Sequence, residues 1–160
     1  VVGRGGAVGA ADARGLGRLP VGRAKPLLAD ASMGPYVVCA LQECRRMNVL
    51  LGELNKSLSD LEKGLNGQLN MTQAMEDLCT AFSISQWPGR NPYSECKWEK
   101  TSWPSKKSLM PQYADMIRRH GQPVSWTEDL VTPPSVWISG RFNPMAYLTG
   151  RTHVTRTSHV

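Results

Sequence analysis

Residues 37–65 read VVCALQECRRMNVLLGELNKSLSDLEKGL, and the spacing of the apolar side chains in this stretch decides the fold. These side chains recur every three or four positions, at Val37, Leu41, Cys44, Met47, Leu51, Leu54, Leu58, Leu61 and Leu65. An α-helix brings such positions onto one face, so the period predicts a long helix with an apolar stripe, here named the leucine seam. The helix is roughly 42 Å long at 1.5 Å per residue. We expect it to stop near Gly64 and Gly67.

A helix of that length is too long for a compact domain of 160 residues unless it packs on something larger. The sequence opens with Val, which favours an internal piece of a longer protein. Its net charge is +6, and the excess of basic residues lies mainly near the two ends. Aromatic residues do not alternate with the arginines as a nucleic-acid stacking surface requires, and no apolar run approaches the roughly 20 residues of a membrane span. We therefore expect neither nucleic acid nor a membrane as a partner.

The sequence divides into three parts by composition. Residues 1–34 are rich in Gly, Ala and Arg without any hydrophobic period, and such a segment is predicted to be disordered because it buries too little apolar surface. Residues 35–149 carry the helical patterns, and 150–160 show no pattern and are predicted to be an unstructured tail. The predicted fold is mainly α: one long helix, two or three shorter helices and a short extended segment near the C-terminus.

The shorter helices follow from local signals. Thr72 is a predicted N-cap whose hydroxyl accepts a first-turn N–H, ahead of a stripe of apolar residues. That stripe contains Met75, Leu78, Cys79 and Phe82. A third helix is predicted over 109–119, closed by Gly121 and Pro123. Val136 to Ile138 favours an extended segment and Asn143-Pro144 a turn or a helix start.

Residues 84–107 are predicted to be a loop, because several prolines interrupt regular structure there. Three tryptophans in that loop, Trp87, Trp98 and Trp103, are costly to leave in water. We therefore expect them to pin the loop onto the helices.

The residue patterns of common catalytic sites are missing from the sequence. It contains no phosphate-binding Gly-x-x-x-x-Gly-Lys-Ser/Thr loop, no Gly-x-Ser-x-Gly elbow and no His-Glu-x-x-His pair. The four cysteines form no Cys-x-x-Cys pair, and the histidines lie well downstream of them. We therefore predict no catalytic residue, no cofactor-binding residue and no metal ligand, and expect the cysteines to be reduced and structural.

Several stretches together resemble one family over residues 36–149. The stretch Val37-Val38-Cys39-Ala40-Leu41-Gln42-Glu43-Cys44-Arg45-Arg46-Met47-Asn48, the step Trp103-Pro104-Ser105 and the helix around Ala114-Asp115-Met116-Ile117 are similar to the C-terminal region of dynein heavy chains. The sharpest match is Trp137-Ile138-Ser139-Gly140-x-Phe142-Asn143-Pro144-x-x-Tyr147-Leu148-Thr149, here named the signature segment (137–149). Its Phe-Asn-Pro form resembles the axonemal heavy chains. Arg141 departs from the family, which has an aromatic residue there, and would place a charge where the family buries a ring.

The resemblance implies a mechanical role without catalysis. It implies that this region braces the ATPase ring of a minus-end-directed microtubule motor that drives ciliary or flagellar movement, in the cytoskeleton of the axoneme. The implied partner is the remainder of the motor ring, with dynein intermediate and light chains and the microtubule engaged only through the parent. The packing or interface candidates are Leu41, Leu51, Leu54, Leu58, Leu61, Trp103, Trp137, Phe142 and Tyr147.

Two other functions stay open at this point. The protein can be a free-standing helical adaptor that binds a partner helix through its leucine seam, or a small hydrolase with an unrecognised site. If the seam lacks its native partner surface, the isolated protein is expected to be a poorly packed monomer or an aggregate.

Overall fold

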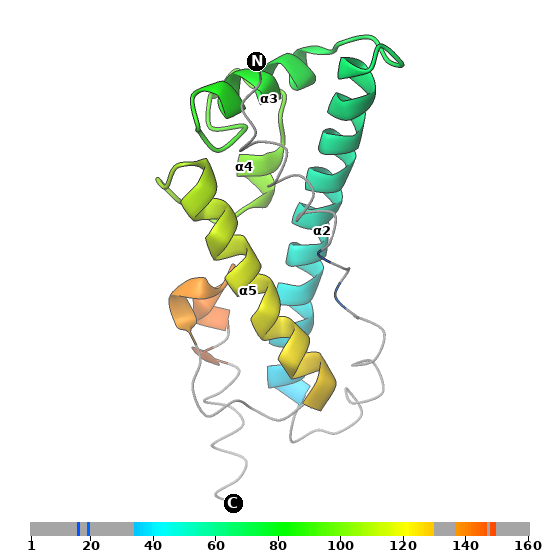
Figure 1. The fold of residues 1–160 in the computed structure, drawn as a ribbon. Helices are drawn as coiled ribbons and strands as arrows, with labels where there is room; N and C mark the ends of the chain where they lie inside the picture. The colour runs from blue at the N-terminus through cyan, green and yellow to red at the C-terminus, as the bar shows by residue number, and fades with distance from the viewer. Residues whose placement is uncertain (1–15, 17–18, 20–33, 130–136, 147, 150–160) are drawn as a thin grey trace, which may run out of the picture. The chain divides into compact units, whose positions relative to one another are not determined.

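The computed structural model describes residues 34–129, 137–146, 148 and 149, together with Leu16 and Leu19. Its elements are α2 (Gly34–Leu65), α3 (Gln73–Ser83), α4 (Trp98–Thr101), α5 (Leu109–Asp129) and the 3-10 turn η2 (Ile138–Gly140). Residues 144–146 and 148–149 are also helical, and no strand occurs in the described ranges. The prediction of a mainly α fold built on one long helix is confirmed (Figure 1).

The molecule separates into two compact units. Unit 1 comprises Val1–Gly17 and Val49–Ile117, and unit 2 comprises Arg18–Asn48 and Arg118–Val160. Most of the predicted disordered segment 1–34 and the whole predicted tail 150–160 lie outside the described residues, so the three-part division stays a prediction. Leu19 is described, and it is buried in unit 2 with its backbone N–H and C=O both bonded to the side-chain amide of Asn48, at 2.8 and 3.0 Å.

Helix α2 confirms the period of the leucine seam and begins earlier than predicted, at Gly34. Its C-terminal end is closed by a hydrogen-bond pair: Gln68 N donates to Lys63 O at 2.8 Å and Gly67 N donates to Gly64 O at 3.0 Å. This pair is the Schellman motif, which requires a left-handed residue, and Gly67 provides it with a φ of 73°. Gly67 is therefore the stop signal, whereas Gly64 lies inside the helix.

Helix α3 begins where the sequence predicts, but its cap works differently. Thr72 is the N-cap residue, with an extended backbone, yet its hydroxyl makes no capping hydrogen bond. Its carbonyl oxygen instead accepts the N–H groups of Met75 and Glu76, at 3.0 and 3.1 Å. The prediction of the position is confirmed and that of a side-chain cap is wrong, because the first N–H groups of an exposed helix start can bond to water instead.

Helix α5 continues well beyond its predicted end at residue 119. It runs through Gly121 and Pro123 to Asp129, so the prediction that these two residues close it is wrong. A glycine in a helix costs about 1 kcal/mol and a proline about 3 kcal/mol, so contacts elsewhere can outweigh both. Such contacts exist just before the predicted end, where Arg118 and Arg119 lie against Trp137.

The predicted extended segment near the C-terminus ends one residue earlier than expected. Trp137 has an extended backbone, with φ −78° and ψ 90°, but Ile138 already belongs to η2. Val136 lies outside the described residues. The helix start expected at Pro144 is confirmed, since 144–146 are helical. Among the described residues, none of the helices has the length and apolar character needed to cross a bilayer.

Candidate functional site

The leucine seam is buried by the protein itself as far as Leu61, whereas its last member, Leu65, is exposed. The candidates Leu41, Leu51, Leu54, Leu58 and Leu61 are each at most 7% exposed. In unit 1, side chains of α3, the 84–107 loop and α5 are buried as well, such as Leu78, Trp87 and Met116. This corrects the expectation that these leucines pack on something larger than the protein. A side chain with so little exposed area has no surface left for a second partner.

The segment 84–107 contains the short helix α4 (Trp98–Thr101), so the prediction of a loop throughout is wrong there, because no proline falls within those four residues. The tryptophans of this loop segment are buried, as predicted from their cost in water: Trp87, Trp98 and the candidate Trp103 are at most 5% exposed. The rings of Trp87 and Trp98 lie with centroids 5.4 Å apart, and Phe82 of α3 meets the Trp98 ring at 5.8 Å in an edge-to-face arrangement. Trp98 Nε1 donates to Ser57 Oγ on α2 at 2.7 Å. The aromatic cluster thus attaches the loop to two helices of unit 1.

Arg90 connects the two ends of the same loop by hydrogen bonds. Its Nη2 donates to the carbonyl oxygens of Ser105 and Lys107, at 2.9 and 3.0 Å, and to Gln112 Oε1 at 3.2 Å. Gly89 adopts a φ of 85°, and a Cβ at that position would lie 2.5 Å from the carbonyl oxygen of Cys96. Both features bring the loop backbone into close contact with itself, so its path depends on these two residues.

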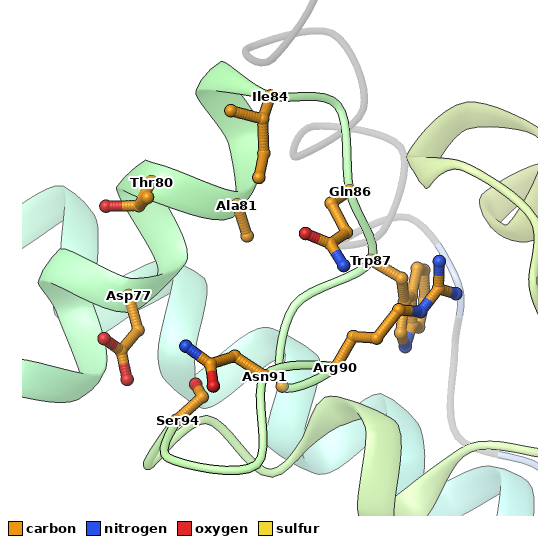
Figure 2. Close-up of a pocket in the computed structure, with 10 residues that line it drawn as sticks. Asp77, Thr80, Ala81, Ile84, Gln86, Trp87, Arg90, Asn91 and Ser94 are labelled. Carbon is orange, nitrogen blue, oxygen red and sulfur yellow. The ribbon is translucent and has the colours of Figure 1, made fainter.

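A shallow pocket of about 120 Å³ lies between α3 and this loop (Figure 2). Its single carboxylate, Asp77, is already engaged: Oδ1 accepts Gln73 Nε2 at 3.1 Å and Oδ2 accepts the backbone N–H of Glu95 at 3.0 Å. These bonds, first of all the one from Gln73, hold the pKa of Asp77 below its usual value. The lining contains no histidine, no cysteine and no second carboxylate, so Asp77 orders the loop and has no partner there for acid–base chemistry.

The signature segment is attached to α2 and α5 within unit 2 by two charged side chains. Glu43 is buried, and its carboxylate oxygens accept the backbone N–H groups of Phe142 and Asn143, at 2.8 and 2.9 Å. On α5, Arg119 donates to the carbonyl oxygens of Gly140 and Ser139, at 3.0 and 3.2 Å. Charged partners make such bonds stronger than neutral ones.

The aromatic candidates of this segment are less buried than those of the loop. Trp137 is half-buried, with the guanidinium groups of Arg118 and Arg119 at 4.3 and 5.3 Å from its ring centre. Gly140 lies against the same ring, because a Cβ there would approach Trp137 Cε3 to 2.4 Å. Phe142 is half-buried, and Tyr147 lies outside the described residues.

Arg141 is buried, with 5% of its surface exposed. This agrees with the prediction that the charge lies where the family buries an aromatic ring. The charge of Arg141 acts on Cys39 and Cys44 of α2 and lowers their pKa, but burial outweighs it. Desolvation, with a smaller contribution from Glu43, raises the pKa of Cys44 to about 11. Cys44 is therefore a protonated thiol at neutral pH, without the thiolate that nucleophilic chemistry requires.

The sequence missed Glu43 and Arg119 as positioning residues, because each acts on backbone atoms far away in the sequence. Glu43 lies 99 and 100 positions from its two partners. The one available signal was the acidic residue on the apolar side of the seam: Glu43 directly precedes Cys44, and a carboxylate that close to a buried face requires a donor.

The protein is similar to dynein heavy chains over most of its length. The family of the C-terminal domain of the dynein heavy chain matches residues 18–159. The protein is 42% identical over 119 residues to mouse dynein axonemal heavy chain 17, and 43% identical over 115 residues to the ciliary dynein beta chain of Tripneustes gratilla. It is also 42% identical over 115 residues to the flagellar outer arm beta chain of Chlamydomonas reinhardtii.

These alignments include 72–74% of this sequence and 2% of each relative, so the protein spans a very small part of the heavy chains that it matches. The family match extends over nearly the whole sequence and includes the signature segment with the two helices that hold it. The relatives are heavy chains of axonemal, ciliary and flagellar dyneins. The protein belongs to the family of C-terminal domains of dynein heavy chains.

Proposed function

We propose that this protein forms the part of an axonemal dynein heavy chain that braces the ATPase ring, in a parent motor that moves toward the minus ends of microtubules and drives ciliary or flagellar movement. The brace itself carries no catalytic residue and no cofactor. It acts in the axoneme, where it meets the remainder of the motor ring. Intermediate chains, light chains and the microtubule are engaged only through the parent.

The observation that carries this proposal is the attachment of the signature segment to α2 and α5. The signature segment is attached to α2 because Glu43 accepts two of its backbone N–H groups, and to α5 because Arg119 donates to two of its carbonyl oxygens. Such bonds to backbone atoms fix a shape, and they occupy both charged groups within the protein. A backbone segment held on two helices within unit 2 is what a mechanical brace requires.

The test is a full-length heavy chain in which residues 36–149 are deleted, compared with the same heavy chain bearing Tyr93→Ala as a control. Tyr93 is 92% exposed, so its loss should change nothing. We expect the deletion to change the ATPase rate of the ring and the velocity of microtubule gliding. Rates and velocities equal to those of the control would refute the brace.

The adaptor function is not favoured, because its binding face is the leucine seam and the seam is buried from Val37 to Leu61. We accordingly replace the expectation of a poorly packed monomer or an aggregate with that of a folded monomer for the isolated protein. Analytical ultracentrifugation measures the difference, and a discrete homodimer would favour the adaptor.

A further inference from the structure

The turn between α2 and α3 presents apolar side chains to the solvent. We name residues 65–71 the helix-turn tip. Within it Leu65, Leu69 and Met71 are 64%, 44% and 41% exposed. Three large apolar side chains within seven residues, all outside the core, are unusual for a surface turn, where isolated apolar residues are the norm.

The backbone of the helix-turn tip is held by hydrogen bonds. Its backbone is closed onto the last turn of α2 by the Schellman bonds of Gly67 and Gln68, and Leu69 N also donates to Lys63 O at 3.3 Å. The side chain of Met71 folds back on α2, because a Cβ added to Gly64 would lie 2.8 Å from Met71 Sδ. A preorganised surface loses little conformational freedom when it is covered, so its apolar area converts efficiently into binding free energy.

The chemistry of the tip selects an apolar, uncharged partner. No charged residue occurs from Gly64 to Met75, and the polar side chains of the tip itself are all amides: Asn66, Gln68 and Asn70. A surface without charge gains nothing from an acidic or basic partner, whereas it matches an apolar depression edged by hydrogen-bonding groups.

The small area of the tip identifies the kind of occupant. Three partly exposed side chains offer on the order of a few hundred Å², whereas a stable interface between separate proteins buries about 800 Å² on each partner. A second copy of the protein or a free partner would therefore be held too weakly. A partner tethered in the same polypeptide binds at a high effective concentration and needs no such area. The relatives supply such a tether, since the aligned part is only 2% of each of them.

We propose that the helix-turn tip docks in an uncharged apolar depression on another part of the same heavy chain, and so serves as one fixed contact of the brace. The inference rests on the proposed function, because it requires the parent heavy chain. It assigns the contact to Leu65, Leu69 and Met71 and not to the buried leucines of the seam.

A photo-crosslinking amino acid at position 69 of the full-length heavy chain tests the proposal. We expect an intrachain crosslink that joins residue 69 to a peptide outside the 160 residues of this sequence. The matched control places the same group at Tyr93, which belongs to the same unit and is even more exposed. A crosslink from position 69 to a separate subunit or to a second heavy chain would overturn the proposal, and so would the absence of any crosslink.

A double variant, Leu65→Ser with Leu69→Ser, gives an independent readout by hydrogen exchange. In the full-length heavy chain we expect the amides of the tip to exchange about tenfold faster than in the unmodified protein, because the covering surface is lost. In the isolated 160-residue protein the same variant should leave exchange unchanged, and Ile84→Ser is the matched control. Equal exchange in the full-length heavy chain would overturn the docking.

The outcomes separate the two proposals. If the deletion of 36–149 changes the ring ATPase while position 69 gives no intrachain crosslink, the brace stands and the assigned contact fails. If the deletion has no effect, the brace itself fails whatever the crosslinks show.

Discussion

The loop 84–107 and the signature segment 137–149 both contain tryptophan, proline and glycine, yet they differ in how far their tryptophans are buried. In the loop, Trp87 and Trp98 are buried almost completely, and an indole hydrogen bond from Trp98 accompanies that burial. In the signature segment, Trp137 is only half-buried, and two charged side chains hold the backbone. Similar residues therefore do not imply a similar attachment. Charged side chains bond to the backbone of both segments, so what differs between them is how much aromatic surface is buried against the helices.

The largest effect is expected from Trp98→Ala, which removes the centre of the aromatic cluster. The cavity left behind and the lost burial should lower the free energy of unfolding by about 3–5 kcal/mol. Urea denaturation of the protein measures this, with Tyr93→Ala as a control that stays within about 0.5 kcal/mol. A loss below about 1 kcal/mol would show that burial does not hold the loop.

Glu43→Ala should cost about 2–3 kcal/mol, because it leaves the N–H groups of Phe142 and Asn143 without their charged acceptor. Hydrogen exchange should accelerate at these two amides and not in the loop 84–107. Gln42→Ala is the matched control, since Gln42 is exposed on the same helix. Exchange that accelerates equally in both regions would remove the distinction between them.

Gly140→Ala and Gly121→Ala should act in opposite directions. A methyl group at position 140 meets the ring of Trp137 and should cost about 1–3 kcal/mol. At position 121, inside α5, a Cβ has no atom within 4 Å, so alanine should stabilise the helix by up to about 1 kcal/mol. Thermal unfolding of both variants provides the comparison, and a neutral Gly140→Ala would mean that the ring of Trp137 moves freely.

The smallest effect concerns pH. Burial raises the pKa of Glu99, and the charge of Arg90 only partly opposes it. The folded protein therefore binds this proton more tightly than the unfolded protein, and its contribution to stability is lost as the pH rises from the ordinary carboxyl range through the raised pKa. Glu99→Gln should abolish that loss in urea titrations. Asp77 has the opposite pH dependence: its pKa is lowered, so its contribution to stability is lost as the pH falls. Asp77→Asn should therefore abolish that loss of stability at acidic pH.

Short-range patterns predicted the helices well because they report which face of a helix is apolar. The register of α2 and the start of α3 at Thr72 both follow from spacing and capping rules. The predicted end of the third helix failed, because Gly121 and Pro123 are weak local signals beside the contacts of Arg118 and Arg119 with Trp137. A glycine or proline in a sequence indicates a local free-energy cost to the helix. It does not indicate the tertiary contacts that offset this cost.

The site was predicted less completely than the fold. Trp137 and Phe142 were identified as candidates through the resemblance to the family. The sequence contains no indication of the residues that contact them. The carboxylate of Glu43 meets its partners 99 and 100 residues away, and Asn48 meets Leu19 29 residues away. Such pairings depend on the folded path of the backbone and produce no periodic pattern in the sequence.

The sequence by itself determined that this protein is helical, that its long helix carries one apolar face, and that the tryptophans of its loop avoid water. Each of these follows from the hydrophobic effect acting on residues close together in the sequence. Only the tertiary structure decided that the leucine seam is covered by the protein itself as far as Leu61, and that exposed apolar surface gathers at the turn after α2. The reason is that burial depends on which distant residues come together, and no local pattern encodes that.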